Sequence, residues 1–416
     1  MKIKDIVTFV SKSITPQKGV TYNLYSLPSF DEGKTFEVLD GADIQSNKYD
    51  VPNKCILFNK LNVRFKRVWR IDSHDENKIA STEFLPLVVD EDVVDFQYCY
   101  YLLISDKITN YLCGQNTNTS GSHKRIDPDN FLNIEIKLPK MSIQRQIGKT
   151  LSALDRKIVL NKQINDNLEA MAKQLYDYWF VQFDFPNVEG KPYKSSGGAI
   201  VWNEKLKREI PQGWSDCVLG DYIGRITNGL NPRKNFVLGS GNNYYVTIRS
   251  LVGTTIDWNN CDRCDDEALS KINSRSQLQI GDIIFSAIGT IGRTYYILEE
   301  PTNWNISETS FTLRAKENIP NDFFYGMLRS NEIQIKADKA AMGSTLRCLV
   351  MDSLCSLQYI EIPSYMMKLF ATKVSPLYRQ IHRNNKEIAE LTKQRDELLP
   401  LLMNGQASVN YHLSDD

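Results

Sequence analysis

Five short stretches in the first half of this chain recur, weakly but in the same order, in its second half. One such match would mean little, whereas five in order indicate that a whole structural unit is duplicated. The repeat is about 180 residues long, so the chain is expected to fold as two similar parts. The pairs are IKDIV (3–7) with LGDYI (219–223), KCILFN (54–59) with GDIIFS (281–286), ASTEFLPLVV (80–89) with NISETSFTLRA (305–315), YYLLIS (100–105) with YGMLRS (325–330), and GSHKRIDPDNFLNIEIKLP (121–139) with GSTLRCLVMDSLCSLQYIEIP (343–363).

Each repeat mixes strands and helices. Runs of β-branched and aromatic residues, such as CILF, DIIF and TYYIL, predict short strands. The stretches 96–108 and 323–335 predict short helices. Residues 187–213 contain GKPYKSSGG and IPQG, whose Gly, Pro and Ser residues indicate an irregular connector between the repeats.

A long helix is predicted after each repeat, because apolar residues there alternate by three and four positions. This alternation is typical of the seam along which two helices of a coiled coil pack. The two seams match at one fixed offset, which predicts that the helices pair. A helix over 147–178 would be about 48 Å long. The seam residues are Ile147, Leu151, Leu154, Ile158, Leu168 and Leu175 in the first helix, and Phe370, Val374, Leu377, Ile381, Ile388, Leu391 and Leu398 in the second.

Asn161 and Asn384 occupy the same position in the middle of the two seams. A buried amide costs stability unless it is hydrogen-bonded, and it thereby fixes the register of a helix pair. In an antiparallel pair the two amides are expected to meet. The alternative is that each helix packs only on its own domain and holds its Asn at the solvent edge.

These features predict an α+β fold with a pseudo-two-fold internal repeat. Two similar mixed α/β domains are separated by two long helices, which pair as an antiparallel coiled coil. The expected boundaries are 1–139 and 214–363 for the domains, 140–182 and 364–404 for the helices, 183–213 for the connector and 405–416 for a C-terminal tail.

The stretch LYDYWFVQFDFP (175–186) concentrates six aromatic residues at the end of the first helix. No Lys or Arg lies between Gln174 and Gly190, so this stretch does not favour base stacking, which needs cations beside the rings. The fixed offset carries residues 175–180 onto LLPLLM (398–403), so both helices end in an apolar patch that suits subunit docking. The alternative is that the whole patch is intramolecular core. The residues predicted to dock a partner are Tyr176, Tyr178, Trp179, Phe180, Leu399, Leu402 and Met403.

Composition limits the class of protein without selecting a partner. Lys+Arg and Asp+Glu both total 50, so a nucleic-acid binder of this kind must concentrate its positive charge locally. The eight Cys are irregularly spaced, which indicates a reducing, cytoplasmic location rather than a disulfide framework. No apolar run reaches about 18 residues, so no membrane span is expected.

No catalytic or metal site is predicted. The chain has no Pro-Pro loop of an amino-methyltransferase, no P-loop and no G-x-G-x-x-G. Asp129, Glu135 and Lys137 resemble a Mg²⁺-dependent nuclease signature, but the second repeat lacks the Lys, and the stretch is interpreted as the exit strand of the domain. Cys261 and Cys264 have zinc-like spacing without the second pair of ligands that a structural site needs.

The order of these motifs resembles the DNA-specificity subunit of type I restriction–modification enzymes, and the resemblance covers nearly the whole chain. It implies two target-recognition domains, each reading one half of a split sequence in double-stranded DNA. It also implies two methyltransferase subunits docked on the helices and a restriction (nuclease-translocase) subunit that joins them. S-adenosylmethionine, ATP and Mg would act in those partners, with no cofactor in this chain. The motifs are LP (138–139), Q-x-x-I (144–147), LYDYWF-x-Q-F-D-F-P (175–186), G-x-P-Y-K-S-S-G-G (190–198), V-W-N-x-x-L-K-R-x-I-P-x-G-W (201–214) and R-D-x-L-L-P-L-L-M-x-G (395–405).

DNA contacts are predicted where basic and hydroxyl residues gather in similar places of both repeats. Arg and Lys bind phosphates and guanine, and a Gly-Ser loop precedes Arg in both repeats, at Gly121 and Gly343. For any single Arg, a merely solvated charge is an equal alternative. The candidates are Lys60, Arg64, Lys66, Arg67, Ser122, Lys124 and Arg125 in the first repeat, and Arg233, Lys234, Arg249, Thr290, Arg293, Ser344 and Arg347 in the second.

Two other functions stay open from the sequence. One is a single-chain restriction nuclease component, and the other is a coiled-coil scaffold that does not bind DNA. The helix pair is expected to set the number of unread base pairs if the chain reads a split target.

Overall fold

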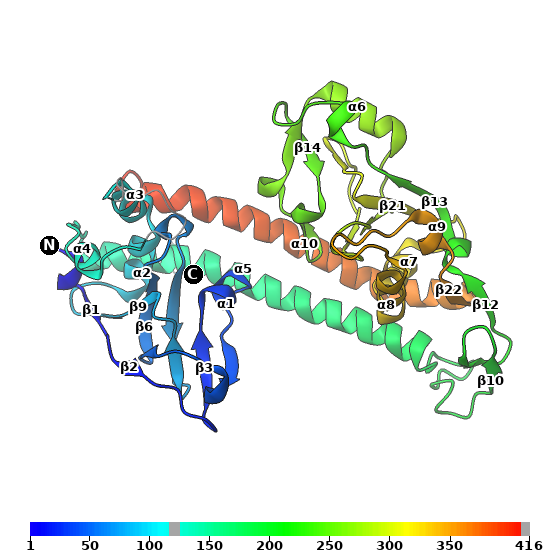
Figure 1. Ribbon diagram of the computed structural model, residues 1–416, viewed down its shortest axis with the longest axis horizontal. Coiled ribbons are helices and arrows are strands. Elements are labelled where there is room, and N and C mark those ends of the chain that lie inside the picture. Colours follow the sequence, from blue (N-terminus) through cyan, green and yellow to red (C-terminus); the bar gives the residue numbers. More distant parts are fainter. Residues whose placement is uncertain (116–124, 409–416) are drawn as a thin grey trace, which may run out of the picture. The chain divides into compact units, whose positions relative to one another are not determined.

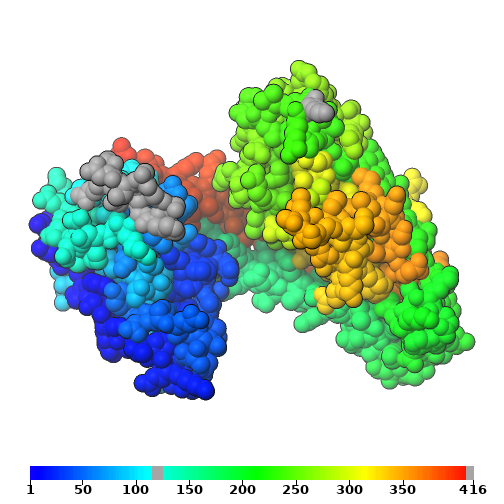
Figure 2. Space-filling view, viewed as in Figure 1, coloured from blue at the N-terminus to red at the C-terminus, as the bar shows by residue number. Residues whose placement is uncertain are grey.

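The computed structural model describes residues 1–115 and 125–408, which belong to two compact units. Unit 1 comprises residues 1–159 and 389–416, and unit 2 comprises residues 160–388. The globular part of unit 1 is blue to cyan in Figures 1 and 2, and that of unit 2 is green to orange. Both long helices contribute one segment to each unit, because the units divide the chain within the helices.

The central sheet of each unit has four antiparallel strands in the same order. In unit 1, Leu57 pairs with Trp69, and in unit 2 Ile284 pairs with Tyr295, so the registers also correspond. The order is β1 (Val7–Phe9), β9 (Phe84–Val89), β6 (Lys54–Asn59), β7 (Val68–Asp72) in unit 1, and β13 (Ile223–Asn228), β21 (Ser310–Ala315), β18 (Ile283–Ser286), β19 (Thr294–Tyr296) in unit 2. The internal repeat predicted from the sequence is therefore confirmed at the level of topology.

A second sheet in each unit contains one parallel pair of strands. In unit 1 β3 runs parallel to β8, and in unit 2 β14 runs parallel to β20. Each of these two sheets also has an antiparallel neighbour, β4 beside β3 and β17 beside β14. The orders are β2 (Ser13–Ile14), β5 (Lys48–Asp50), β8 (Lys78–Ala80), β3 (Thr21–Tyr25), β4 (Glu37–Asp40) in unit 1, and β17 (Asp262–Cys264), β14 (Asn243–Val246), β20 (Trp304–Ile306) in unit 2.

Short helices follow the sheets in the same order in both units. Polar N-caps start the first of them in unit 1 and the second in unit 2: the Asp95 carboxylate accepts a hydrogen bond from the Tyr98 backbone N–H at 2.9 Å, and the Ser330 hydroxyl accepts one from the Ile333 N–H at 3.4 Å. The corresponding helices are α2 (Phe96–Ile104), α3 (Asp106–Gln115) and α4 (Pro128–Leu132) in unit 1, and α7 (Asn321–Leu328), α8 (Asn331–Ala340) and α9 (Met351–Cys355) in unit 2.

The remaining elements differ between the units or connect them. The segment predicted to be an irregular connector contains a two-stranded hairpin, β10 with β11. These elements are α1 (Leu27–Asp31), α6 (Asp266–Arg275), β10 (Ile200–Asn203), β11 (Arg208–Pro211), β12 (Ser215–Val218), β15 (Leu251–Val252), β16 (Thr255–Ile256), β22 (Gln358–Glu361), a π-helical turn η4 (Asp177–Val181) and the 3₁₀ helices η1 (Ile3–Asp5), η2 (Gly41–Asp43), η3 (Val63–Phe65), η5 (Leu219–Tyr222), η6 (Pro232–Lys234), η7 (Ile248–Ser250) and η8 (Trp258–Asn260).

The two long helices, α5 (Met141–Tyr176) and α10 (Ser364–Met403), pack against each other in opposite directions (Figure 1). In unit 1 the Arg395 guanidinium donates to the Asp155 carboxylate at 3.0 Å. In unit 2 the Asn161 amide donates to Glu387 at 2.8 Å. Because higher residue numbers on α5 meet lower numbers on α10, the pairing is antiparallel, as predicted.

The asparagines of the seam have other partners than the sequence predicted. Asn161 and Asn384 are both buried, at 2% and 5% exposure, but they do not bond to each other. The Asn384 amide instead donates to the Asn165 Oδ1 at 2.8 Å, and the Asn165 amide donates to the Asn385 Oδ1 at 2.8 Å. The two helices are thus shifted by about one turn from the register in which the two seam asparagines would meet.

Replacing Asn165 with Leu is expected to lower the free energy of unfolding of unit 2 by about 1–3 kcal/mol. Asn165 is 5% exposed, and its removal leaves the Asn384 donor and the Asn385 acceptor without this partner in a buried layer. Hydrogen exchange along α5 and α10 measures the loss, with the exposed Asn167→Leu as control. Equal protection in both variants would contradict a stabilising role for the amide layer.

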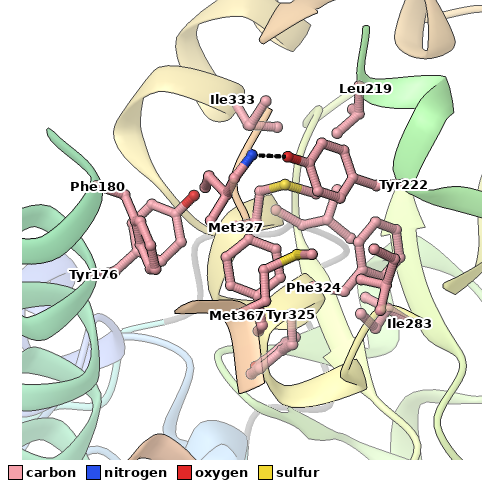
Figure 3. Packing of buried hydrophobic residues seen from close by; sticks show 14 of the residues in the cluster. Tyr176, Phe180, Leu219, Tyr222, Ile283, Phe324, Tyr325, Met327, Ile333 and Met367 are labelled. Atoms are coloured by element: carbon pink, nitrogen blue, oxygen red, sulfur yellow. Dashed lines mark hydrogen bonds between the residues drawn. The ribbon is translucent and has the colours of Figure 1, made fainter. Parts of the chain in front are cut away.

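The aromatic run at the end of α5 forms part of the core of unit 2 (Figure 3). Tyr176, Trp179 and Phe180 are at most 4% exposed, and the Phe180 ring lies 5.2 Å from Phe370 and 5.5 Å from Phe323. In unit 1 the Leu402 side chain is likewise buried, at 4% exposure.

This chain's own core covers the side chains of Tyr176, Trp179, Phe180 and Leu402, which favours the alternative of an intramolecular core, and their docking role stays a prediction. The structure leaves Tyr178 exposed, at 37%, and leaves Leu399 and Met403 partly buried against the core of unit 1.

Candidate nucleic-acid interface

In unit 1 the predicted basic residues gather on the loop between β6 and β7. The loop contains η3, which lies between two residues in the left-handed region, Asn62 (φ 51°) and Lys66 (φ 48°). Phe65 stands at this turn with 52% of its side chain exposed, and the guanidiniums of Arg64 and Arg67 each lie 4.8 Å from its ring centroid. A cation over an aromatic ring is stabilised by the ring's quadrupole, so Phe65 orients both arginines. The sequence reasoning missed Phe65, although its position between two basic residues is visible there.

Arg125 joins this loop from a distant part of the chain. The Ile126 N–H donates to the Lys60 carbonyl at 2.9 Å, and the Lys60 N–H donates to the Glu83 carbonyl at 2.9 Å. The Arg125 guanidinium contacts the Glu83 carboxylate through Nε at 3.0 Å and Nη2 at 2.7 Å. This hydrogen bonding raises the pKa of Arg125. Lys60, Arg64, Lys66, Arg67 and Arg125 are named loop cluster 1; the candidates Ser122 and Lys124 lie outside the described residues.

Two further members of loop cluster 1 have acidic partners, as Arg125 does. Lys66 pairs with Asp106 at 2.5 Å, and Arg67 contacts both carboxylate oxygens of Asp31 at 2.7 Å. Exposed ion pairs contribute about 0–1 kcal/mol, so a phosphate can replace the carboxylate of such a pair at small cost.

In unit 2 the corresponding loop joins β18 to β19 and lies against the loop 342–348. The Gly289 N–H donates to the Arg347 carbonyl at 2.8 Å, and the Leu349 N–H donates to the Ala287 carbonyl at 2.8 Å. These backbone bonds hold the loop that contains Thr290 and Arg293 against the loop that contains Ser344 and Arg347. Gly289 (φ 80°) permits the turn, because side-chain-bearing residues rarely adopt this conformation.

Arg249 completes this group through Arg293. The Arg293 Nη1 donates to the carbonyls of Ile248 and Leu251, both at 3.1 Å, and so holds η7 against the β18–β19 loop. The side chain of Arg249 is 74% exposed, and its contact with Asp262 is long, at 4.0 Å. Arg249, Thr290, Arg293, Ser344 and Arg347 are named loop cluster 2.

The members of loop cluster 2 differ in how free their side chains are. Arg347 contacts the Asp338 carboxylate at 2.7 Å and also donates to the Asp338 carbonyl. Arg293 is committed to two carbonyls, whereas the contact of Arg249 among the described residues is its long ion pair. Of these three arginines, Arg249 is therefore the one best able to contact a ligand.

Arg233 and Lys234 lie apart from the loops of cluster 2 along the chain, in η6. The Asn231 side chain caps η6 by accepting from the Arg233 N–H at 3.0 Å, and its amide donates to Glu308 at 2.7 Å. Arg233 is exposed. The side chain of Lys234 is not among the described atoms.

The nuclease-like and zinc-like patterns form no site within the described residues. Glu135 and Lys137 are exposed and alternate with the buried Ile134 and Ile136, as in an extended segment. The Cys261 thiol donates to the Asp257 carbonyl at 3.4 Å, while Cys264 is buried. Across residues 1–115 and 125–408, no cluster of three His, Cys, Asp or Glu side chains could hold a metal, and no helix is long and apolar enough to span a membrane.

Comparison with known proteins identifies relatives of this chain. Residues 1–170 match the family model described as the type I restriction modification DNA specificity domain. The chain is 26% identical over 340 residues to the type I restriction enzyme MjaIX specificity subunit of Methanocaldococcus jannaschii, covering 80% of this chain and 74% of the relative. It is 23% identical over 419 residues to the HindI specificity subunit of Haemophilus influenzae, covering 87% and 90%.

A solved structure shares the fold. The crystal structure of the type I restriction–modification system S subunit from M. genitalium superposes with a TM-score of 0.58 at 15% identity, covering 97% of this chain and 95% of that one.

The structure thus combines a duplicated β-rich domain, two packed long helices and a basic loop cluster on each copy. Over most of its length the chain is similar to specificity subunits of type I restriction enzymes, and residues 1–170 match the DNA specificity domain of such systems.

Proposed function

We propose that loop clusters 1 and 2 each read one half of a bipartite, asymmetric DNA target. The proposal rests on position: the β6–β7 loop and the β18–β19 loop occupy the same place in two sheets of the same order, and arginines lie on the first loop and on or against the second. Arginine can donate to guanine and to phosphate, so such loops suit both positioning on DNA and reading of bases.

The two halves of the target are expected to differ in sequence, because the two clusters differ in chemistry. Cluster 1 presents an exposed aromatic ring, Phe65, below two guanidiniums. Cluster 2 presents Arg249 together with the hydroxyl residues Thr290 and Ser344, which are exposed. Hydroxyl groups can bond several base edges, while an aromatic ring offers apolar contact.

The helix pair is proposed to set the number of unread base pairs and to dock two methyltransferase subunits, with a restriction subunit joining the assembly. An exposed apolar stripe along the unit 2 part of α5 and the following turn η4 supports docking. Leu160, Ile164 and Met171 on α5 are 49%, 36% and 54% exposed, and Tyr178 on η4 continues their spacing with 37% exposure. Exposed apolar residues gathered on one face mark protein interfaces. S-adenosylmethionine, ATP and Mg are proposed to act in the partner subunits.

Replacing Arg249 with Ala is expected to weaken binding of the assembled methyltransferase by about 1–3 kcal/mol and to relax only the second half-site. Arg64→Ala is the matched change in cluster 1 and should relax only the first. Arg156→Ala, an exposed arginine on α5, is the control. Methylation-site sequencing of cells carrying each variant reports both halves of the target. Identical motifs in all three variants would count against reading by these clusters.

The two other functions predict different results in direct assays. A nuclease component would cleave DNA with Mg²⁺ as a purified chain, and a scaffold would shift no DNA in a gel with or without its methyltransferase. The proposal requires a sequence-dependent gel shift of the assembled methyltransferase and no cleavage by this chain alone.

A further inference from the structure

The hairpin β15–β16 in unit 2 touches both long helices at its tip. The tip consists of Gly253, whose positive φ of 56° permits the turn, and Thr254. The Thr254 hydroxyl donates to the Glu169 carboxylate on α5 at 3.1 Å. The Asn385 amide on α10 donates to the Thr254 hydroxyl at 3.3 Å and to its carbonyl at 3.4 Å. One threonine is therefore bonded to both members of the helix pair.

The two helix residues that hold Thr254 are themselves fixed by other contacts. The second oxygen of Glu169 accepts from the Arg329 Nη2 at 2.6 Å, and Arg329 also donates to the Tyr325 hydroxyl at 2.8 Å. The Asn385 Oδ1 accepts from the buried Asn165, which belongs to the amide layer of the seam. Side chains whose remaining polar atoms are bonded lose little further freedom on making a contact, so this seat is preorganised.

The other end of the same hairpin holds loop cluster 2. The Leu251 carbonyl, in β15, accepts from Arg293, and so does the Ile248 carbonyl three residues earlier. Arg249 lies between these two acceptors. The Asp257 N–H donates to the Ser250 carbonyl at 2.8 Å, which closes the base of the hairpin. A short segment thus links the helix pair to two of the arginines expected to face DNA.

Unit 1 has a different element at the corresponding place. In unit 1 the chain between β3 and β4 forms the short helix α1, whereas between β14 and β17 of unit 2 it forms η7, the hairpin and η8. The connection through the hairpin is thus a feature of unit 2.

We propose that Thr254, Glu169 and Asn385 are positioning residues for reading of the second half-site. They seat the hairpin on the helix pair and thereby hold Arg249 and Arg293 in the orientation that meets DNA. They contact no DNA themselves, and their effect is confined to the half-site read by unit 2. This inference rests on the proposed function of loop cluster 2.

The test uses the assembled methyltransferase and two DNA libraries, one randomised in the first half-site and one in the second. Thr254→Val removes the hydroxyl at nearly constant volume and is expected to lower discrimination at the second half-site by about tenfold, with the first unchanged. Glu169→Gln is expected to act in the same direction, because it weakens the contact with Arg329. Thr254→Ser restores the hydroxyl and should restore discrimination.

The control is Thr255→Val, an exposed threonine one residue further along the hairpin. Thermal unfolding of Thr254→Val should match that of Thr255→Val, since a merely structural role would lower stability and would affect both libraries. Unchanged selection by Thr254→Val, or equal relaxation of both half-sites, overturns the inference while a bipartite wild-type motif upholds the proposed function. A wild-type assembly without a bipartite motif overturns both.

Discussion

Replacing Phe180 with Ala is expected to lower the free energy of unfolding of unit 2 by about 3–5 kcal/mol. The side chain is 1% exposed, and its ring packs among those of Tyr176, Phe323 and Phe370 at centroid distances of 5.0, 5.5 and 5.2 Å. Removing the ring loses the free energy of burying it and leaves a cavity among side chains from α5, α7 and α10. A loss of this size is a large part of the stability of most domains.

Tyr178→Ala is the matched control, because it removes a neighbouring aromatic ring that is 37% exposed. A substitution outside the core is usually within about 0.5 kcal/mol of neutral, so this variant should unfold almost as the wild type does. Hydrogen exchange measured by mass spectrometry reports unit 2 separately from unit 1. Equal protection of α7 in the Phe180 and Tyr178 variants would mean that the run does not belong to the core.

The repeat and the paired helices could be predicted because each is indicated by several residues that recur at regular positions in the sequence. Phe58 and Phe285 occupy matching places in the central strands of the two sheets, and both are buried. Along the helices, Ile158 and Ile381 follow the predicted offset and are 6% and 4% exposed. A seam needs only the right face of each helix, which the three-four alternation specifies.

The register of the helix pair could not be predicted in the same way. Alternation fixes which face is buried but leaves the helices free to slide by about one turn, a rise of about 5.4 Å. The choice between such registers depends on polar partners outside the seam pattern. Asn161 is hydrogen-bonded to Glu387, and Asn384 is hydrogen-bonded to Asn165. Each amide thus has a partner although the two seam asparagines do not contact each other.

The sequence also could not show whether the aromatic run at 175–186 is buried core or a docking surface, because both have the same composition. What covers Tyr176 comes from far along the chain: its ring lies 5.6 Å from Phe370 and 6.3 Å from Phe323. The exposed stripe that contains Leu160 and Met171 could not be predicted either, because isolated apolar residues are common on long helices and do not show in the sequence which of them stay exposed.

The sequence identifies the basic residues of the candidate interface, but it does not show which of their side chains are free to contact DNA. Charge in a sequence does not show which carboxylate a guanidinium will meet after folding. Arg67 meets Asp31 and Arg347 meets Asp338, whereas Arg249 keeps a side chain that is 74% exposed. The most informative new residue is Phe65, whose ring is recognisable as a support for arginines only when the turn around η3 is known.

Inserting one heptad into both long helices is expected to change the preferred spacer of the DNA target and to leave both half-sites unchanged. The insertion points are after Val159 in α5 and after Ile388 in α10, where the two compact units divide. Seven residues add about 10 Å to each helix and keep the seam on nearly the same face. That length corresponds to about three base-pair steps of B-DNA.

The same heptad placed in α5 alone is the control, because α5 is then longer than α10 between the contact of Asp155 with Arg395 and the contact of Asn161 with Glu387. The two contacts cannot both be kept, so this variant should pair poorly and methylate little. The double insertion keeps both contacts and should methylate a motif with the two original halves and a longer gap. A double insertion that folds, binds both half-sites and keeps the original gap would show that the helix pair does not measure the spacer. New half-site sequences would instead mean that the insertion had disturbed loop clusters 1 and 2, whose geometry depends on contacts within each unit.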